Sequence, residues 1–171
     1  MTLKTTSTAI LALSLFAVAA CSKKAPEQLP PPPVGTETDG SNDYGNNAVV
    51  PGSQQDFVAS VASDRIFFGF DQYNVDAEDQ ATLRSQAQWL QRNPAVRVLL
   101  EGHADERGTR DYNIALGERR ANAAKNFLAS LGIDPSRIDV LSYGKERPAA
   151  IGSDEEAYAQ NRRAVTVVIQ R

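Results

Sequence analysis

Helical and strand-like hydrophobic patterns alternate along the last two thirds of the chain. The run at 65–70 is apolar and aromatic, and it predicts a strand. Asp76 is a potential helix cap. After it, the apolar residues Leu83, Ala87 and Leu90 recur on one helix face. The full pattern predicts strands at 65–70, 96–101, 138–143 and 162–170, and helices at 76–93, 111–131 and 153–160.

These elements follow one another in the order β-α-β-α-β-α-β. Such an alternation is typical of an α+β domain, here with a mixed four-stranded sheet and helices packed on one face. We expect this domain over residues 61–171, since about 110 residues are enough for a core that folds alone. A polar loop is expected at 102–108, between the second strand and the second helix.

The N-terminus carries an apolar run at 9–20 behind a single early positive charge, Lys4. As a helix these residues would reach about 18 Å, which is well short of a hydrocarbon core of roughly 30 Å. A short apolar run behind a basic residue is typical of a secretory signal peptide. The pattern therefore predicts a signal peptide at 1–20.

Cys21 is the only cysteine of the chain and follows directly on this apolar run. The small residues before it resemble a bacterial lipobox, which implies lipidation with a diacylglyceryl group and an N-acyl chain such as palmitate. The alternative is an ordinary signal peptide with an incidental cysteine. Three acyl chains would bind a membrane far more firmly than one. The cysteine is followed by Ser22 and not by Asp, which resembles the pattern of lipoproteins that are sorted to the outer membrane. The domain would then face the periplasm.

A change in composition marks the segment 21–60 as a flexible tether. Its four prolines at 30–33 favour a local polyproline II rod, and glycines among polar residues follow. With little apolar periodicity, such a segment cannot offset the entropy of ordering. About 38 residues could span on the order of 125 Å when fully extended, or about 35 Å as a coil.

Charge and residue counts exclude several classes of function. A formal net charge of -3 gives no basic field, so we expect no nucleic-acid partner. A zinc enzyme would have to use the single histidine, His103, with Asp105 and Glu106, and three ligands within four loop residues lack the usual spacing. No carboxylate pair points to a glycosidase and no nucleophile lies beside the histidine. We therefore expect no enzyme and no cofactor.

The second predicted helix carries a mixed chemical face close to the loop that precedes it. Tyr112, Leu116 and Arg120 recur at i, i+4 and i+8, which places an aromatic, an apolar and a cationic side chain together. Arg119 lies about 100° away and cannot face the same spot. Loops at the C-terminal ends of strands commonly carry binding sites, so we expect a pocket here.

The charges of this region fit the head of an amino acid. A zwitterionic head needs an acceptor for its ammonium, which Asp105 can supply, and a fork of donors for its carboxylate, which Arg120 can supply. The alternative is that these two residues only pair with each other, or with Arg107 and Glu118. Spacing alone leaves both interpretations open.

The motifs together resemble the OmpA-like C-terminal domain family. The resemblance covers about residues 62–171 and is highly specific. It is carried by residues 70–71, 102–109, 112–121 and 161–164. It implies the OmpA-like sandwich fold, and together with the lipobox it points to the lipid-anchored members of the family.

This resemblance implies binding to the diaminopimelate of the peptidoglycan stem peptide. Residue by residue, Asp105 matches the family's acceptor for the ligand ammonium, and Arg120 matches the helix arginine that takes the carboxylate. Arg162 matches an arginine that contacts the ligand. The positions that match pocket-lining residues are Phe70, Asp71, Tyr112 and Leu116.

The resemblance also implies partners in the envelope. Lipid-anchored relatives link the outer membrane to peptidoglycan within the Tol-Pal system, which serves envelope integrity and cell division, and they bind TolB and other Tol-system proteins. The alternative function is a periplasmic protein-interaction module that binds TolB and has only weak wall contact. TolB and the wall are expected to compete if their surfaces overlap.

Overall fold

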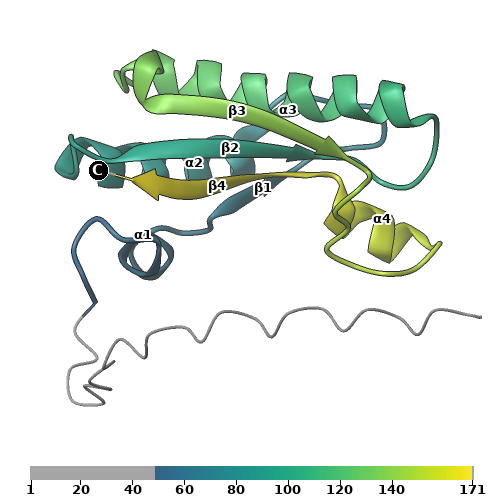
Figure 1. Cartoon of the computed structure of the whole chain (residues 1–171), viewed down its shortest axis with the longest axis horizontal. Coiled ribbons are helices and arrows are strands. Elements are labelled where there is room, and N and C mark those ends of the chain that lie inside the picture. Colours follow the sequence, from purple (N-terminus) through teal and green to yellow (C-terminus); the bar gives the residue numbers. More distant parts are fainter. Residues whose placement is uncertain (1–48, 171) are drawn as a thin grey trace, which may run out of the picture. The chain divides into compact units, whose positions relative to one another are not determined.

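The computed structural model describes residues 49–170 (Figure 1). The expected signal peptide, Cys21 and most of the expected tether lie outside these residues. No helix within the described range is long and apolar enough to cross a membrane. The elements are α1 (Gln54–Ser60), β1 (Arg65–Phe67), α2 (Ala77–Arg92), β2 (Arg97–His103), α3 (Arg110–Ser130), a 3-10 turn (Pro135–Arg137), β3 (Ile138–Gly144), α4 (Glu155–Asn161) and β4 (Arg163–Gln170).

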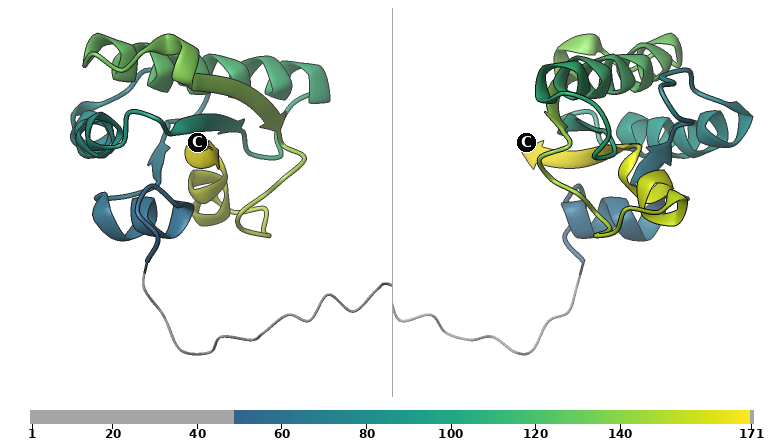
Figure 2. Two further views of the ribbon diagram at one scale, coloured as in Figure 1. Left: turned by 60° about the vertical axis from the view of Figure 1, so that its left-hand side comes forward. Right: turned by 90° about the vertical axis from the view of Figure 1, so that its right-hand side faces the viewer.

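The four strands form one mixed sheet in the order β1-β4-β2-β3. Strands β2 and β3 are parallel, whereas β4 pairs antiparallel with both β1 and β2. The long helices α2 and α3 lie together on one side of the sheet, and the short helices α1 and α4 lie toward opposite ends of β4 (Figures 1 and 2). The prediction of an α+β domain with a mixed four-stranded sheet is confirmed.

The helices begin where the sequence offers caps. The Asp76 side chain accepts a hydrogen bond from the backbone N–H of Asp79 at 2.9 Å and caps α2. Asp154 caps α4 in the same way through the N–H of Ala157, at 2.8 Å. Gly132, which follows the C-cap residue Leu131 of α3, takes a φ of 90°, which favours glycine at a helix end. The predicted helix limits are therefore correct to within a residue or two.

The core lies between the sheet and the two long helices. Val98 and Leu100 of β2 point into it and are at most 1% exposed, as the alternation along the strand predicts. Leu128 of α3 packs against them. Strand β2 continues beyond the predicted residue 101 through Gly102 to His103. The predicted loop therefore starts two residues later than expected.

A short helix, α1, lies inside the segment that the sequence analysis assigned to the tether, and this part of the prediction is wrong. Phe57 of α1 is fully buried, and its ring meets the Trp89 ring edge-on at 5.0 Å. Asp56 accepts hydrogen bonds from the backbone of Gly52 and from the Trp89 indole. The helix has seven residues with Phe57 as its one buried side chain, which is too short a run for a periodic signal.

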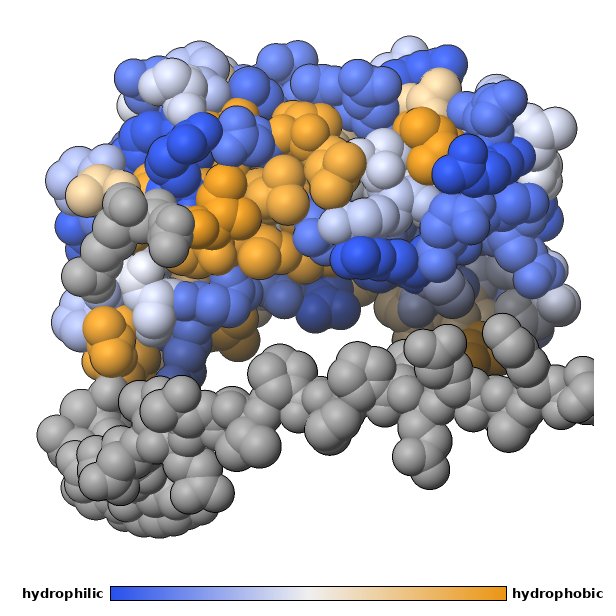
Figure 3. Space-filling view, in the orientation of Figure 1, coloured by the Kyte–Doolittle hydropathy of each residue, from blue (hydrophilic) through white to orange (hydrophobic). Residues whose placement is uncertain are grey.

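The other face of the sheet is partly exposed and apolar. Leu99 of β2 is paired with Val167 of β4, and Leu141 of β3 is 42% exposed. Figure 3 shows apolar atoms gathered on this side of the sheet, in the same orientation as Figure 1. Figure 1 shows that neither α2 nor α3 lies in front of this face.

Candidate functional site

A cavity of about 180 Å³ lies where β2 ends and α3 begins. It combines two segments that the sequence separates by more than thirty residues, the turn after β1 and the β2–α3 loop. Its lining holds two carboxylates and two guanidinium groups. The lining residues are Phe70, Asp71, Ala104, Asp105, Arg107, Gly108, Tyr112, Asn113, Leu116 and Arg120.

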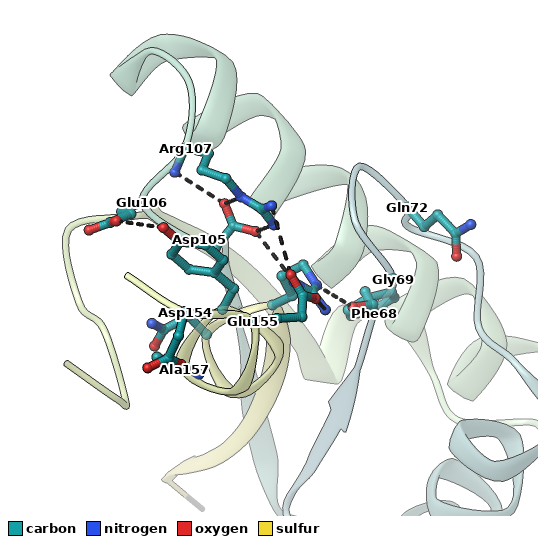
Figure 4. Close-up of polar contacts among 12 residues, drawn as sticks. Phe68, Gly69, Gln72, Asp105, Glu106, Arg107, Asp154, Glu155 and Ala157 are labelled. Carbon is teal, nitrogen blue, oxygen red and sulfur yellow. Dashed lines mark hydrogen bonds and ion pairs between the residues drawn. The ribbon is translucent and has the colours of Figure 1, made fainter. Parts of the chain in front are cut away.

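Asp105 is the buried carboxylate of this cavity and is only 5% exposed. Its Oδ1 accepts hydrogen bonds from the backbone N–H of Arg107 at 3.1 Å and from the Arg107 Nε at 3.2 Å. Its Oδ2 accepts from the Arg107 Nη2 at 2.6 Å, as Figure 4 shows. Burial raises the pKa of the Asp105 carboxyl, but the contacts with Arg107 outweigh that effect and hold the pKa below its usual value. Asp105 is therefore charged at neutral pH.

Arg120 is the buried cation of the cavity, and it is fully buried. Its Nε donates to the carbonyl oxygen of Gln72 at 2.8 Å, and its Nη2 donates to that of Gly69 at 3.1 Å. Its Nη1 donates to the carbonyl oxygen of His103 at 2.8 Å. Burial lowers the pKa of Arg120 to about 10, so the guanidinium stays charged at neutral pH. Arg120 thus holds the turn after β1 against the end of β2.

Asp71 is the second carboxylate and sits at the tip of that turn. Its φ of 56° lies in the left-handed region, where it is the one non-glycine residue among residues 49–170. The Tyr112 hydroxyl donates to its Oδ1. Strained backbone of this kind is often found at binding sites. The link between Asp71 and Tyr112 joins the turn to the first turn of α3.

The structure brings together most of the residues that the sequence analysis selected. Six of the seven expected ligand-binding residues line the cavity, namely Phe70, Asp71, Asp105, Tyr112, Leu116 and Arg120. Arg162 lies behind Asp105, with its Nη1 3.6 Å from the Asp105 Oδ2 and its Nη2 2.8 Å from Glu155. The helical face of Tyr112, Leu116 and Arg120 is confirmed as a structural feature, while the binding role of all seven residues stays a prediction.

The pairing alternative of the sequence analysis is correct for Asp105 and incorrect for Arg120. Asp105 does pair with Arg107. Arg120 makes its hydrogen bonds to three backbone carbonyls instead of to Glu118. Arg107 and Asn113 also line the cavity but were not among the predicted site residues, although both stand in the motifs at 102–109 and 112–121. The Asn113 side chain donates to the carbonyl oxygen of Arg107 at 2.8 Å, which fixes the loop from inside.

His103 does not reach the cavity with its side chain. It is 2% exposed and its ring stacks on Tyr143 at a centroid distance of 5.5 Å. Burial lowers the pKa of His103 to about 4, so the imidazole is neutral near pH 7. Within residues 49–170 no group of three or more His, Cys, Asp or Glu side chains is arranged to hold a metal ion. The cavity itself offers charged side chains of both signs, Asp71 and Asp105 with Arg107 and Arg120.

Comparison with known proteins places this domain in a family. The OmpA family model matches residues 67–162. The peptidoglycan-associated lipoprotein of Brucella melitensis biotype 1 is 48% identical over 161 residues, which cover 92% of this chain and 90% of that protein. The chain belongs to the peptidoglycan-associated lipoproteins of the OmpA family. Another such lipoprotein, from Agrobacterium fabrum, is 55% identical over 124 residues, which cover 72% of this chain and 70% of that protein.

Solved structures agree with this assignment to the OmpA family. The crystal structure of the peptidoglycan-associated lipoprotein from Burkholderia pseudomallei superposes with a TM-score of 0.62 at 44% identity, and the match covers 63% of this chain and 92% of that one. The C-terminal domain of Helicobacter pylori MotB gives a TM-score of 0.59 at 19% identity, covering 63% of this chain and 85% of that one. The MotB match shows a shared fold alone.

Proposed function

We propose that the domain binds peptidoglycan non-covalently by holding the amino-acid head of diaminopimelate in the cavity between β2 and α3. The observation that carries this proposal is that Asp105 and Arg120, charged and buried, line one cavity. A zwitterionic head brings one ammonium and one carboxylate, and each meets an opposite charge there. The relatives are peptidoglycan-associated lipoproteins by name, which supports peptidoglycan as the binding partner.

The hydrogen-bonding capacity of Arg120 supports this assignment. A guanidinium has five N–H donors, and three of those of Arg120 are used by backbone carbonyls. Two N–H groups remain for a ligand carboxylate. Asp105 accepts the ligand ammonium, and the exposed ring of Tyr112, at the rim, covers the apolar part of the side chain. Phe70 covers it from the opposite segment, the turn after β1.

The proposed function includes a link between two layers of the envelope. Lipidation at Cys21 anchors the chain in the outer membrane, and the polar segment that follows lets the domain reach the wall in the periplasm. The chain thereby takes part in the Tol-Pal system and supports envelope integrity and cell division. Relatives that are lipoproteins by name support the anchor. The domain acts as a binding module without catalysis.

Co-sedimentation with purified sacculi tests the binding site. The full chain without its signal peptide, carrying Cys21→Ser to keep it free of lipid, is mixed with sacculi and centrifuged. We expect it to sediment, to be released by free meso-diaminopimelate, and to leave the wall uncleaved. Asp105→Asn should abolish sedimentation, because it removes a charge-assisted contact worth about 1.5 to 3 kcal/mol.

Asp139→Asn is the matched control, because it breaks a surface Asp–Arg pair, with Arg97 at 2.8 Å, on a different part of the sheet. It should sediment like the parent protein. Equal sedimentation of Asp105→Asn and the parent would contradict the proposed site. Release of muropeptides from the sacculi would contradict a function without catalysis.

The membrane anchor and the Tol partner need separate tests. In cells, the parent chain should fractionate with the outer membrane, whereas Cys21→Ser should be found in the periplasm and still bind sacculi. Saturating TolB should reduce sacculus binding if TolB and the wall share the surface around the cavity. Undiminished wall binding at saturating TolB would count against this competition.

A further inference from the structure

Arg107 also lines the cavity, but the proposed binding of diaminopimelate gives it no role so far. Three of its N–H groups, those of the backbone, Nε and Nη2, donate to the two carboxylate oxygens of Asp105, at 3.1, 3.2 and 2.6 Å. A carboxylate has about four lone-pair positions, so Arg107 uses three of them. The Arg162 Nη1 lies 3.6 Å from the Asp105 Oδ2 and makes no hydrogen bond to it, so one position on this oxygen is open to another donor.

Two aromatic rings contact the guanidinium of Arg107. Its central carbon lies 4.3 Å from the centroid of the Phe70 ring and 4.2 Å from that of the Tyr158 ring. Such cation–π contacts favour one orientation of the flat guanidinium. The Tyr158 hydroxyl donates to the Glu106 carboxylate at 2.9 Å, which ties the ring of α4 to the same loop. Figure 4 shows Arg107, Asp105 and Glu106 around the end of α4.

We propose that Arg107 is a positioning residue, which orients Asp105 so that one lone pair faces the cavity and accepts the ligand ammonium. Three separate elements contribute: the turn after β1 through Phe70, the β2–α3 loop through Arg107, and α4 through Tyr158. Arg107 is in this way a specificity residue, because a single free lone pair suits one N–H of an ammonium. This inference rests on the proposed binding of diaminopimelate.

The opposite role for Arg107 would be that of a plug that occupies the ammonium position and must leave before the ligand binds. The Glu155 carboxylate, 3.8 Å from the Arg107 Nη1, would be the partner to which a plug moves. Two observations favour positioning. The rings of Phe70 and Tyr158 both contact the guanidinium and hold it in place, and Glu155 is already paired with Arg162 at 2.8 Å.

Two ligands of equal length separate these roles. Meso-diaminopimelate and pimelate have the same carbon chain and the same two carboxylates, and pimelate lacks both ammonium groups. NMR titration of the full chain without its signal peptide, as the Cys21→Ser form, gives the dissociation constant of each ligand. Arg107→Gln should weaken diaminopimelate roughly 10-fold and leave pimelate unchanged, since one well-oriented charge-assisted contact is lost.

Arg107→Lys tests the geometry directly, because it keeps the charge without the fork and without the flat stacking surface. It should not restore the affinity for diaminopimelate. Arg97→Gln is the control, because Arg97 makes a similar ion pair with Asp139 away from the cavity. A carboxyl titration by NMR without ligand adds an independent readout, in which Arg107→Gln should raise the pKa of Asp105.

Each other outcome overturns the inference. Tighter binding of diaminopimelate by Arg107→Gln would make Arg107 a plug, and equal losses for both ligands would make its role purely structural. Full rescue by Arg107→Lys would show that charge alone matters. If the parent protein bound no diaminopimelate, the proposed function itself would fail, and the inference with it. Failure at Arg107 alone would leave the proposed function intact.

Discussion

The backbones of Gly102 in β2 and Gly117 in α3 touch, so closely that a methyl group on Gly102 would overlap the carbonyl group of Gly117. Because of this contact, α3 packs closely against the sheet at Gly117, about one helical turn before Arg120. The position of the cavity therefore depends on two residues without side chains that are not among its lining residues.

Gly102→Ala should destabilise the domain by about 3 kcal/mol or more, because backbone atoms of α3 have to move to admit the methyl group. Urea denaturation checks this value. Gly132→Ala is a suitable control: no atom lies within 4 Å of the added methyl group, so only the cost of its φ of 90° remains, about 1 kcal/mol. Equal losses in both variants would mean that the close contact is not a constraint.

Arg120→Lys should destabilise the domain by about 2 to 4 kcal/mol and abolish wall binding. Lysine keeps one positive charge, but a single nitrogen cannot reach the carbonyl oxygens of Gln72, Gly69 and His103 at once. A buried carbonyl left without a donor, here that of His103, costs about 1 to 3 kcal/mol, and the two part-buried carbonyls add less. Urea denaturation and sacculus sedimentation measure the two effects.

Arg119→Lys, one residue earlier on the exposed side of α3, is the control for that experiment. It should change the unfolding free energy by less than about 0.5 kcal/mol. Wild-type stability of Arg120→Lys would show that the three carbonyl contacts do not hold the turn to the sheet.

Local periodicity was enough to predict most of the fold and one side of the site. The 3.6-residue repeat placed Tyr112, Leu116 and Arg120 on one face, and the strand alternation placed Val98 and Leu100 in the core. The partners of Arg120 were not predictable in this way. Two of them are backbone carbonyls in the turn after β1, about fifty residues away in the sequence, and spacing along a chain carries no information on such contacts.

Helix α1 could not be predicted from local periodicity either, although its one buried side chain, Phe57, belongs to the core. Phe57→Ala should cost about 3 to 5 kcal/mol, because it removes a fully buried ring and its edge contact with Trp89. Val58→Ala, at a neighbouring position that is 51% exposed, should cost much less. Thermal or urea denaturation distinguishes them. Similar stability of the two variants would mean that the domain does not need the residues before 61.

Asp79 gives the domain an unusual dependence of stability on pH. Its Oδ1 accepts a hydrogen bond from the backbone N–H of Phe67 at 3.1 Å, while its Oδ2 is buried and has no hydrogen-bond partner within the described structure. Burial raises the pKa of Asp79 from 3.8 to about 6. Between these two values the folded state binds more protons than the unfolded state, so the contribution of Asp79 is present at low pH and is lost as the pH rises through 6.

Asp79→Asn removes this titration and keeps an oxygen to accept from the N–H of Phe67. The stability of the variant relative to the parent should therefore rise by about 2 kcal/mol between pH 4 and pH 7, because only the parent then has to hold an unpaired buried charge. Urea denaturation at these two pH values measures the difference. A constant difference would show that Asp79 titrates normally in the folded state, and that its buried oxygen is compensated by contacts other than those described.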